Sequence, residues 1–303
     1  MIEHSLHSVV VPAPADVVFG LVAESADWPV VFPPTIHVDH LERSATEERF
    51  RIWATAGDRV KDWVSRRKID RAARVISFRQ EVSRPPIASM SGSWHFTPVA
   101  GGTAVDLRHE YTPVEGDPGA SAWIRQALDA NSEAELASLR VAALGGPVLK
   151  FSDARWIDGP AELAYRFIDE AEHWPSRLPH VDGLDLTVGE DGEQRMTMCT
   201  IGADGSRHTT TSVRIRLESS IVYKQTALPP LLSGHSGRWV FEAAGARCRV
   251  TSEHTVSIKP DAVETVLGSG TTLAQARDFV RRTIGGNSRA TLEHAGRFAE
   301  TAR

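Results

Sequence analysis

The chain repeats itself, and this feature most limits what it can fold into. Three pairs of segments align in the same order without gaps: PADVVFGLVAESADWP (14–29) with PAELAYRFIDEAEHWP (160–175), ISFRQ (76–80) with IVYKQ (221–225), and SGSWHF (91–96) with SGRWVF (236–241). Self-similarity at a constant spacing is the mark of a repeated structural unit. The 303 residues are therefore predicted to form two copies of one domain, residues 1–146 and 147–303, each of ordinary domain size.

Both copies show the same order of expected elements. A short strand (3–11 or 150–157) leads into brief helical stretches that end near a Trp-Pro pair. About six strands with period-two alternation follow, and a long amphipathic helix (about 119–144 or 271–301) closes each copy. An antiparallel sheet with a single long helix buries that helix on its concave face. The predicted fold is α+β, with two tandem helix-grip domains and a cavity between sheet and helix.

Composition excludes several classes of function. The net charge of −5 argues against a nucleic-acid partner, because phosphate binding needs a basic surface. The two cysteines form neither a disulfide framework nor a metal site, which suits a reducing cytoplasm. The N-terminal stretch predicts neither a signal peptide nor a membrane span. Nucleotide-binding and hydrolase motifs are lacking in the sequence, so we expect no cofactor and no metal.

Alternation indicates which side chains face the predicted cavity. Along the strand 62–70, every second residue belongs to one face, which carries a tryptophan, a serine, an arginine and an isoleucine. The residues expected to line the cavity or its mouth are Trp28, Phe32, Trp63, Ser65, Arg67, Phe78, Trp94, Phe96, His109 and Asn131. Most of the aromatic ones would serve equally well as core. His109 alone would suit a hydrogen-bonded buried histidine, and Asn131 a backbone contact.

Arg67 is the residue hardest to explain as core. A buried, unpaired guanidinium costs several kcal/mol or more. Two explanations remain open from the sequence: Arg67 pairs with an inward carboxylate such as Asp106 or Glu110, or it meets an oxygen-rich ligand. The presence of Ser65 and His109 on the same wall favours a ligand.

The duplicated helix-grip pattern, the Trp-Pro pair near Phe32, the W-x-S-x-R strand and the inward His109 resemble the di-domain aromatase/cyclases of bacterial type II polyketide synthases. These belong to the START and Bet v 1-like superfamily, and the resemblance covers both halves. It implies a ketoreduced poly-β-ketone held by an acyl carrier protein, whose first ring closes by an aldol reaction between the seventh and twelfth carbons and then loses water. Other synthase components are further partners that it implies.

The resemblance also implies the catalytic residues Arg67, Ser65 and His109. Arg67 with Ser65 would stabilise the developing oxyanion, and His109 would exchange protons near neutral pH. We then expect Arg67→Ala to lower the aromatised product while the fold survives. A basic rim for the acidic carrier protein would come from Lys61, Arg66, Lys68, Arg71 and Arg74.

The second copy departs from this pattern. The positions of Trp63, Ser65 and Arg67 hold His208, Thr210 and Ser212, and Arg214 could supply the missing cation from the same face. The predicted second pocket consists of Trp174, His208, Thr210, Arg214, Trp239, His254 and Asn287. It is either chemically different from the first or mainly structural.

Two other functions compete with the enzyme. The chain could be a non-catalytic carrier of a lipid or aromatic small molecule, as many START-like proteins are. It could also be a scaffold within a synthase complex. Polar inward residues count against a carrier, since a purely apolar wall would suit it better.

Overall fold

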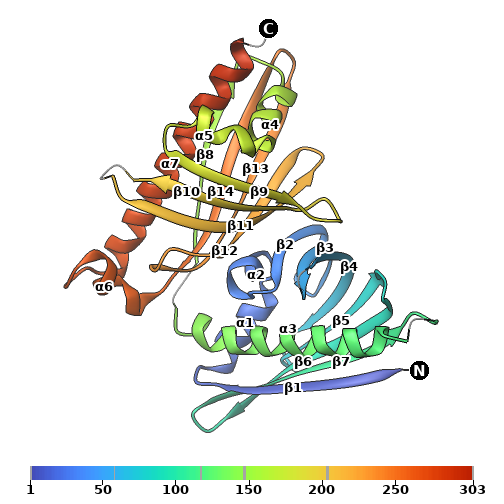
Figure 1. The fold of residues 1–303 in the computed structure, drawn as a ribbon. Helices are drawn as coiled ribbons and strands as arrows, with labels where there is room; N and C mark the ends of the chain where they lie inside the picture. Colours follow the sequence, from blue (N-terminus) through green and yellow to red (C-terminus); the bar gives the residue numbers. More distant parts are fainter. Residues whose placement is uncertain (1, 58, 117, 146–147, 203–204, 302–303) are drawn as a thin grey trace. The chain divides into compact units, whose positions relative to one another are not determined.

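A computed structural model describes residues 2–57, 59–116, 118–145, 148–202 and 205–301. The chain divides into two compact units, Met1–Gly146 and Pro147–Arg303. Each unit holds a seven-stranded antiparallel sheet and one long helix (Figure 1). This confirms the predicted α+β fold with two tandem helix-grip domains.

The N-terminal unit has its strands in the order β1-β7-β6-β5-β4-β3-β2. Its elements are β1 (Glu3–Val11), α1 (Ala15–Ala23), the 3₁₀ helix η1 (Ser25–Asp27), α2 (Trp28–Val31), β2 (Thr35–Arg43), β3 (Glu47–Ala56), β4 (Arg59–Asp70), β5 (Val75–Val82), β6 (Ile87–Val99), β7 (Gly102–Pro113) and α3 (Ala120–Ala142). The first and last strands of the sheet, β1 and β2, are joined in sequence by the α1–α2 segment.

The C-terminal unit repeats this topology, with the strand order β8-β14-β13-β12-β11-β10-β9. Its elements are β8 (Leu149–Ile157), α4 (Ala161–Asp169), η2 (Ala171–His173), α5 (Trp174–Arg177), β9 (Val181–Val188), β10 (Gln194–Ile201), β11 (Arg207–Leu217), β12 (Ser220–Ala227), β13 (Leu232–Ala244), β14 (Arg247–Ile258), η3 (Pro260–Ala262), α6 (Val263–Leu267) and α7 (Leu273–Thr301). The helices η3 and α6 precede the long helix here, in place of the shorter turn that precedes α3.

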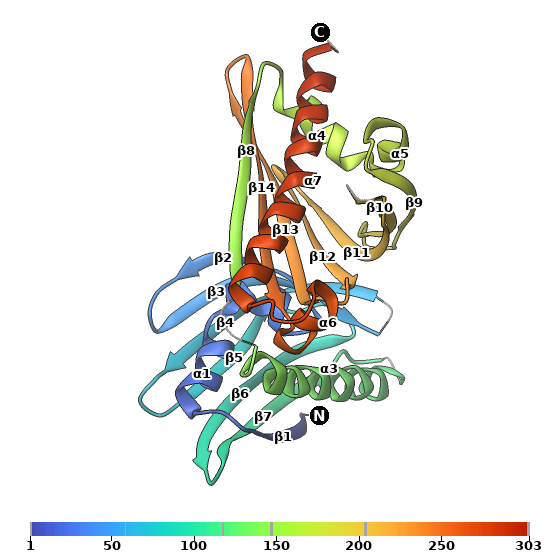
Figure 2. The same cartoon turned by 90° about the vertical axis from the view of Figure 1, so that its left-hand side faces the viewer.

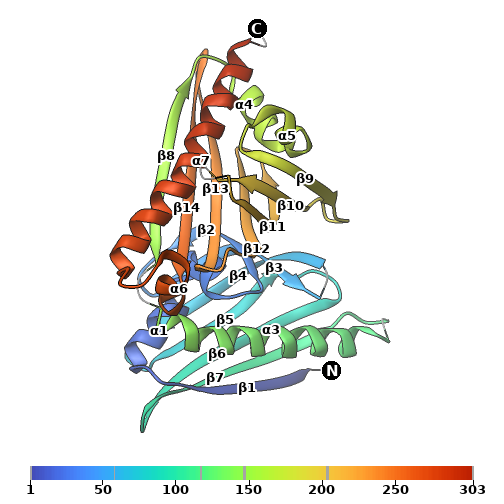
Figure 3. The same ribbon diagram turned by 60° about the vertical axis from the view of Figure 1, so that its left-hand side comes forward.

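Each long helix lies along two neighbouring strands at one edge of its own sheet. Figure 3 shows α3 along β1 and β7, and Figure 2 shows α7 along β8 and β14. The buried side chains of α3 include Ile124, Leu136 and Leu139, which lie at helical spacing on one face. Burial of such a stripe against the sheet is the main source of stability for a helix of this kind.

The described ranges contain no helix that is long and apolar enough to cross a membrane. Within the same ranges, no three histidine, cysteine, aspartate or glutamate side chains gather as a metal site would require.

Candidate functional site

A cavity of about 160 Å³ lies between the sheet and α3 of the N-terminal unit. Its wall is largely apolar and aromatic, with side chains from α2, from the strands β2 to β7 and from α3. A cavity of this size has room for one benzene-sized ring. Such a space suits an apolar ligand whose orientation is set by a few polar groups.

Most of the residues predicted to face the cavity do line it: Trp28, Phe32, Trp63, Ser65, Phe78, Trp94, His109 and Asn131. Phe96 does not, so that part of the prediction was wrong. Its ring packs edge-on against Phe19 of α1, with 5.4 Å between centroids, and it is buried in the core. Phe96 lies two residues beyond Trp94 on β6, where α1 covers the sheet in place of the cavity.

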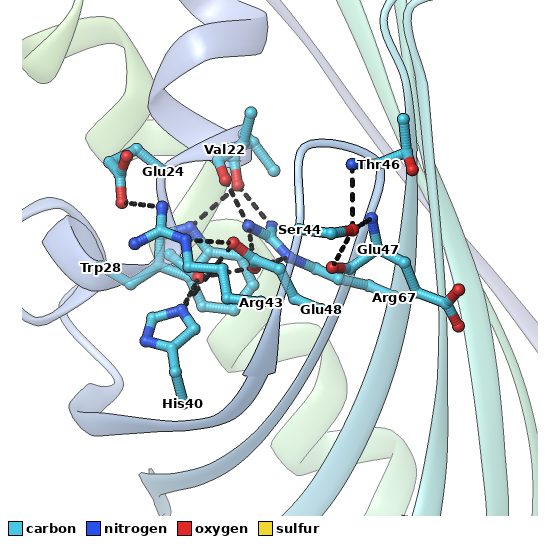
Figure 4. Close-up of polar contacts among 12 residues, drawn as sticks. Val22, Glu24, Trp28, His40, Arg43, Ser44, Thr46, Glu47, Glu48 and Arg67 are labelled. Carbon is cyan, nitrogen blue, oxygen red and sulfur yellow. Dashed lines mark hydrogen bonds and ion pairs between the residues drawn. The ribbon is translucent and has the colours of Figure 1, made fainter.

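Arg67 is buried behind the cavity wall, and it is not among the residues that line the cavity. Its Nε donates to the Glu48 carboxylate at 2.7 Å, its Nη1 to the carbonyl of Val22 at 2.7 Å, and its Nη2 to the carbonyl of Ala23. The guanidinium also lies 4.8 Å from the centroid of the Trp28 ring. Figure 4 shows Arg67 beside Val22, Trp28 and Glu48. Burial lowers the pKa of Arg67 and Glu48 opposes this effect.

The carboxylate expected for Arg67 was therefore misidentified. Asp106 accepts a hydrogen bond from Ser8, and Glu110 lies 3.7 Å from His4. Glu48 is directly opposite Arg67 in the β3–β4 ladder. The sequence held a signal for this pair, because EERFRIWA places Glu48 on the same face as Phe50 and Ile52, both of which are buried.

The two carbonyls that Arg67 holds come from the last turn of α1. Carbonyls at a helix C-terminus lack intrahelical partners, and a cation there is also favoured by the helix dipole. The indole Nε1 of Trp28 donates to the same Val22 carbonyl at 3.1 Å. Arg67 thus joins the end of α1 to the sheet beneath Trp28, and its donors are already engaged.

His109 on β7 is a buried cavity residue whose Nδ1 has no hydrogen-bond partner among the described residues. Burial, with a smaller contribution from His7, lowers its pKa to about 4. The ring is therefore neutral at physiological pH. A neutral imidazole can accept one proton and donate another. The lowered pKa nevertheless corrects the expectation that His109 exchanges protons near neutral pH, because burial makes its ring a weaker base than an exposed histidine.

Other polar groups lie around the same space. Gln80, which the sequence analysis did not select, lines the cavity with a buried Oε1 that has no partner in the described part of the chain. The Ser65 hydroxyl donates to the carbonyl of Arg79 at 3.1 Å, and Asn131 donates to that of Thr55 at 2.8 Å. Gln80 shares a strand face with Phe78, and this alternation could have identified it.

The basic rim proposed from the sequence is only partly available. Arg66 pairs with Glu81, Glu47 and Glu42, and Arg74 pairs with Asp16. Three charged residues do line the cavity: Lys61, which was predicted for the rim, and Arg84 and Glu135, which were not.

Gly92 makes room for the aromatic wall beside His109. It is paired with His109 in the β6–β7 ladder, and the rings of Phe78 and His109 lie 5.5 Å apart. A Cβ at Gly92 would lie 2.5 Å from Cζ of Phe78 and 2.2 Å from the carbonyl oxygen of Arg108. We expect Gly92→Ala to lower the free energy of unfolding by about 1–3 kcal/mol, as overpacking does.

Urea denaturation would measure this effect, with Gly20→Ala as the control. Gly20 lies in α1, and a Cβ there would meet nothing within 4 Å, so alanine should leave the stability unchanged or raise it slightly. Equal stability of Gly92→Ala and wild type would contradict the predicted clash.

The residues predicted for a second pocket do not form one group. His208 and Asn287 are exposed, which corrects their assignment to a pocket, and Trp239 lies within the main hydrophobic core of the C-terminal unit. Thr210, Arg214, Trp174 and His254 are buried. The first residues of β11, 207–209, are exposed, and the helical stripe of α7 places Ser288 inward next to Asn287.

Arg214 takes the structural place of Arg67 in the second unit. It donates to the carbonyl of Ile168 in the last turn of α4, and its guanidinium lies 5.3 Å from the Trp174 ring centroid. Opposite it stands Gln194, where the first unit has Glu48. Burial lowers the pKa of Arg214 to about 10, and its Nη1 lacks a partner among the described residues.

His254 is the centre of a buried polar cluster. Its Nδ1 lies 2.9 Å from the Tyr223 hydroxyl and 3.2 Å from Nε2 of His235, and its Nε2 lies 2.7 Å from Oγ of Ser288 and 3.0 Å from that of Ser252. The equivalent positions in the first unit include Phe78, Met90 and Leu107, which line the cavity. The second unit therefore places a self-paired polar cluster at the position of the first unit's cavity wall.

The buried histidines predict that the protein loses stability in acid. Burial lowers the pKa of His235 and of His109 to about 4, and that of His254 well below its usual 6.5. The unfolded chain therefore binds more protons than the folded one below about pH 6.5, so stability is full above this pH and falls as the pH drops toward 4. From pH 7 to pH 5 we expect a loss of about 2 kcal/mol per histidine.

Urea denaturation at pH 7 and pH 5 would test this expectation. His235→Met, which introduces the first unit's Met90 at this position, should remove one part of the pH dependence. Equal free energies of unfolding at the two pH values would contradict it.

Comparisons with known proteins agree with this description. Residues 4–143 match the model of a family described as polyketide cyclase/dehydrase and lipid transport. The granaticin polyketide synthase bifunctional cyclase/dehydratase of Streptomyces violaceoruber is 45% identical over 310 residues, covering 99% of this chain and 95% of that protein. The actinorhodin counterpart of Streptomyces coelicolor is 45% identical over 317 residues, covering 99% and 98%.

A solved structure has the same two-domain fold. The crystal structure of the di-domain ARO/CYC BexL from the BE-7585A biosynthetic pathway matches with a TM-score of 0.83 and 48% identity, over 99% of both chains. Fold and cavity define a tandem helix-grip protein with a ligand-sized cavity in its first unit. The chain belongs to the family of polyketide synthase bifunctional cyclase/dehydratases, which confirms the resemblance found in the sequence.

Proposed function

We propose that the chain closes and dehydrates the first ring of a poly-β-ketone inside the cavity of the N-terminal unit. The substrate is ketoreduced and arrives on an acyl carrier protein, in the cytoplasm. The observation that carries this proposal is the aromatic cavity, whose wall holds two buried polar atoms without a partner in the described ranges, Nδ1 of His109 and Oε1 of Gln80.

The wall would determine which carbons meet. A poly-β-ketone is reactive by itself, so the main task of the protein is to hold one folded conformation of the chain. Trp28, Trp63 and Trp94 stand around a space that fits one ring. Closure between the seventh and twelfth carbons is the regiochemistry that the resemblance to the di-domain aromatase/cyclases implies.

His109 would carry the protons. The neutral imidazole takes an α-proton, the resulting enolate carbon attacks a ketone carbon, and the imidazolium returns the proton to the new alkoxide oxygen. In the second step the neutral imidazole takes another α-proton and the imidazolium protonates the hydroxyl. The carbon–oxygen bond then breaks, water leaves, and the carbon–carbon double bond forms. In this proposal the polar side chains of Ser65 and Gln80 form hydrogen bonds with oxygen-bearing groups of the substrate. Arg67 takes no direct part, because its donors are engaged with Glu48 and the α1 carbonyls.

Reconstitution tests this function. A minimal polyketide synthase and a ketoreductase are supplied with and without the protein, and the products are profiled by mass spectrometry. We expect the protein to convert a mixture of misclosed products into one with an aromatised first ring. An unchanged product profile would overturn the proposal, and recovery of a bound lipid from the purified protein would then favour a carrier.

A further inference from the structure

We propose that Glu48 is a positioning residue for ring closure, which acts on the substrate through Arg67 and Trp28. This inference rests on the proposed function. Glu48 does not line the cavity, and its side chain is almost completely buried, with 1% exposed. What it does is join the α1–α2 segment, which carries the cavity residues Trp28 and Phe32, to the sheet.

Glu48 reaches this segment at two points. Its Oε2 accepts from the Ser25 hydroxyl at 2.8 Å, and Ser25 opens η1, which leads directly into α2. The same oxygen accepts from Nε of Arg67, which holds the carbonyls of Val22 and Ala23 at the end of α1. One buried carboxylate therefore fixes both the end of α1 and the start of η1.

Other groups hold Glu48 itself in place. Nε of Arg43 lies 3.0 Å from Oε1, and Nε2 of His40 lies 3.8 Å from it. Arg43 also pairs with Glu24 at 2.6 Å, just after α1. Figure 4 shows these side chains converging on Glu48. A buried charge with several partners is held in one geometry, which is what a positioning residue needs.

The link to the cavity is the Trp28 ring. Trp28 lines the cavity, and the Arg67 guanidinium lies 4.8 Å from its ring centroid. A cation over an indole face is an attractive contact, and it is stronger when desolvated. Movement of Arg67 would therefore move or free the Trp28 ring, and with it the wall that bends the substrate.

The second unit offers the matched substitution. It keeps the arginine and the tryptophan as Arg214 and Trp174 but has Gln194 in the place of Glu48. Glu48→Gln introduces glutamine at the equivalent position of the first unit. The second unit shows that glutamine at this position is compatible with the fold. Glu47→Gln is the control, because Glu47 is the neighbouring residue on β3 and pairs with Arg66 on the surface.

The variants are compared in the full chain by reconstitution with a minimal polyketide synthase and a ketoreductase. We expect Glu48→Gln to lower the ratio of aromatised to misclosed products by about tenfold or more, while Glu47→Gln matches wild type. A folded Glu48→Gln with the wild-type ratio would overturn the inference. If Glu48→Gln melts below the assay temperature, Glu48→Asp is used in its place, because aspartate keeps the charge but shortens the side chain. A lowered ratio of aromatised to misclosed products then supports the inference, and the wild-type ratio overturns it.

A second readout does not depend on activity. In protein labelled with 5-fluorotryptophan, the ¹⁹F resonance that Trp28→Phe removes is that of Trp28. This resonance should shift or broaden in Glu48→Gln and stay in place in Glu47→Gln. A Trp28 resonance that does not move in Glu48→Gln overturns the inference. The proposed function fails separately, if adding the wild-type protein to the reconstituted synthase leaves the products unchanged.

Discussion

Replacing Arg67 by alanine is expected to lower the free energy of unfolding of the N-terminal unit by about 3–5 kcal/mol, the usual cost of removing one partner of a buried ion pair. The substitution leaves the buried Glu48 with less compensation and deprives the Val22 and Ala23 carbonyls of their donor. The sequence alone predicted a different result for Arg67→Ala, namely less aromatised product from a protein that still folds.

Hydrogen exchange measured peptide by peptide would report this loss in the N-terminal unit. Arg66→Ala is the matched control, because Arg66 neighbours Arg67 on β4 but its ion pairs are on the surface, where a pair contributes about 0–1 kcal/mol. Equal protection in Arg67→Ala and wild type would show that the buried pair contributes little, and a direct catalytic role for Arg67 would regain support.

Replacing His109 by glutamine is expected to slow formation of the aromatised ring by about 10²–10⁴-fold, the typical contribution of a general acid–base group. Glutamine can still form hydrogen bonds in the cavity but cannot carry a proton between the two steps. The rate is measured in the reconstituted system as aromatised product formed per unit time.

His95→Gln is the control for this substitution. His95 is on β6, and its ring nitrogen lies 2.8 Å from the Ser93 hydroxyl. It does not line the cavity. An undiminished rate in His109→Gln would remove His109 from the proposed mechanism, while an equal loss in both variants would point to a general effect on the sheet.

The sequence was sufficient to predict the fold and most of the cavity wall. The repeat defined the topology twice, and alternation along β4 placed Trp63 and Ser65 on the wall. Alternation indicates the face of a strand, but it does not give the position along that face. Phe96 is on the inner face as predicted, yet α1 covers it.

The hydrogen-bond and ion-pair partners of a side chain were harder to predict than the face of the strand on which it lies. The pairing of Arg67 with Glu48 depends on the register between β3 and β4, which the pattern of β4 alone does not contain. In the second unit, the sequence alignment carried His208 and Asn287 into a pocket, although both are exposed. Along β11 the structural equivalents lie two residues further on than the alignment placed them, because Ser212 and Arg214 stand where the first unit has Ser65 and Arg67.

The central claim is that ring closure takes place in the cavity of the N-terminal unit, and filling this cavity tests it most directly. Ala127 of α3 lines the cavity, whereas Ala130 on the same helix is exposed. The reconstituted products of Ala127→Phe and Ala130→Phe are compared by mass spectrometry. We expect Ala127→Phe to give the misclosed products that form without the protein, and Ala130→Phe to give the wild-type product. Wild-type product from a folded Ala127→Phe would contradict the account and favour a scaffold around spontaneous cyclisation.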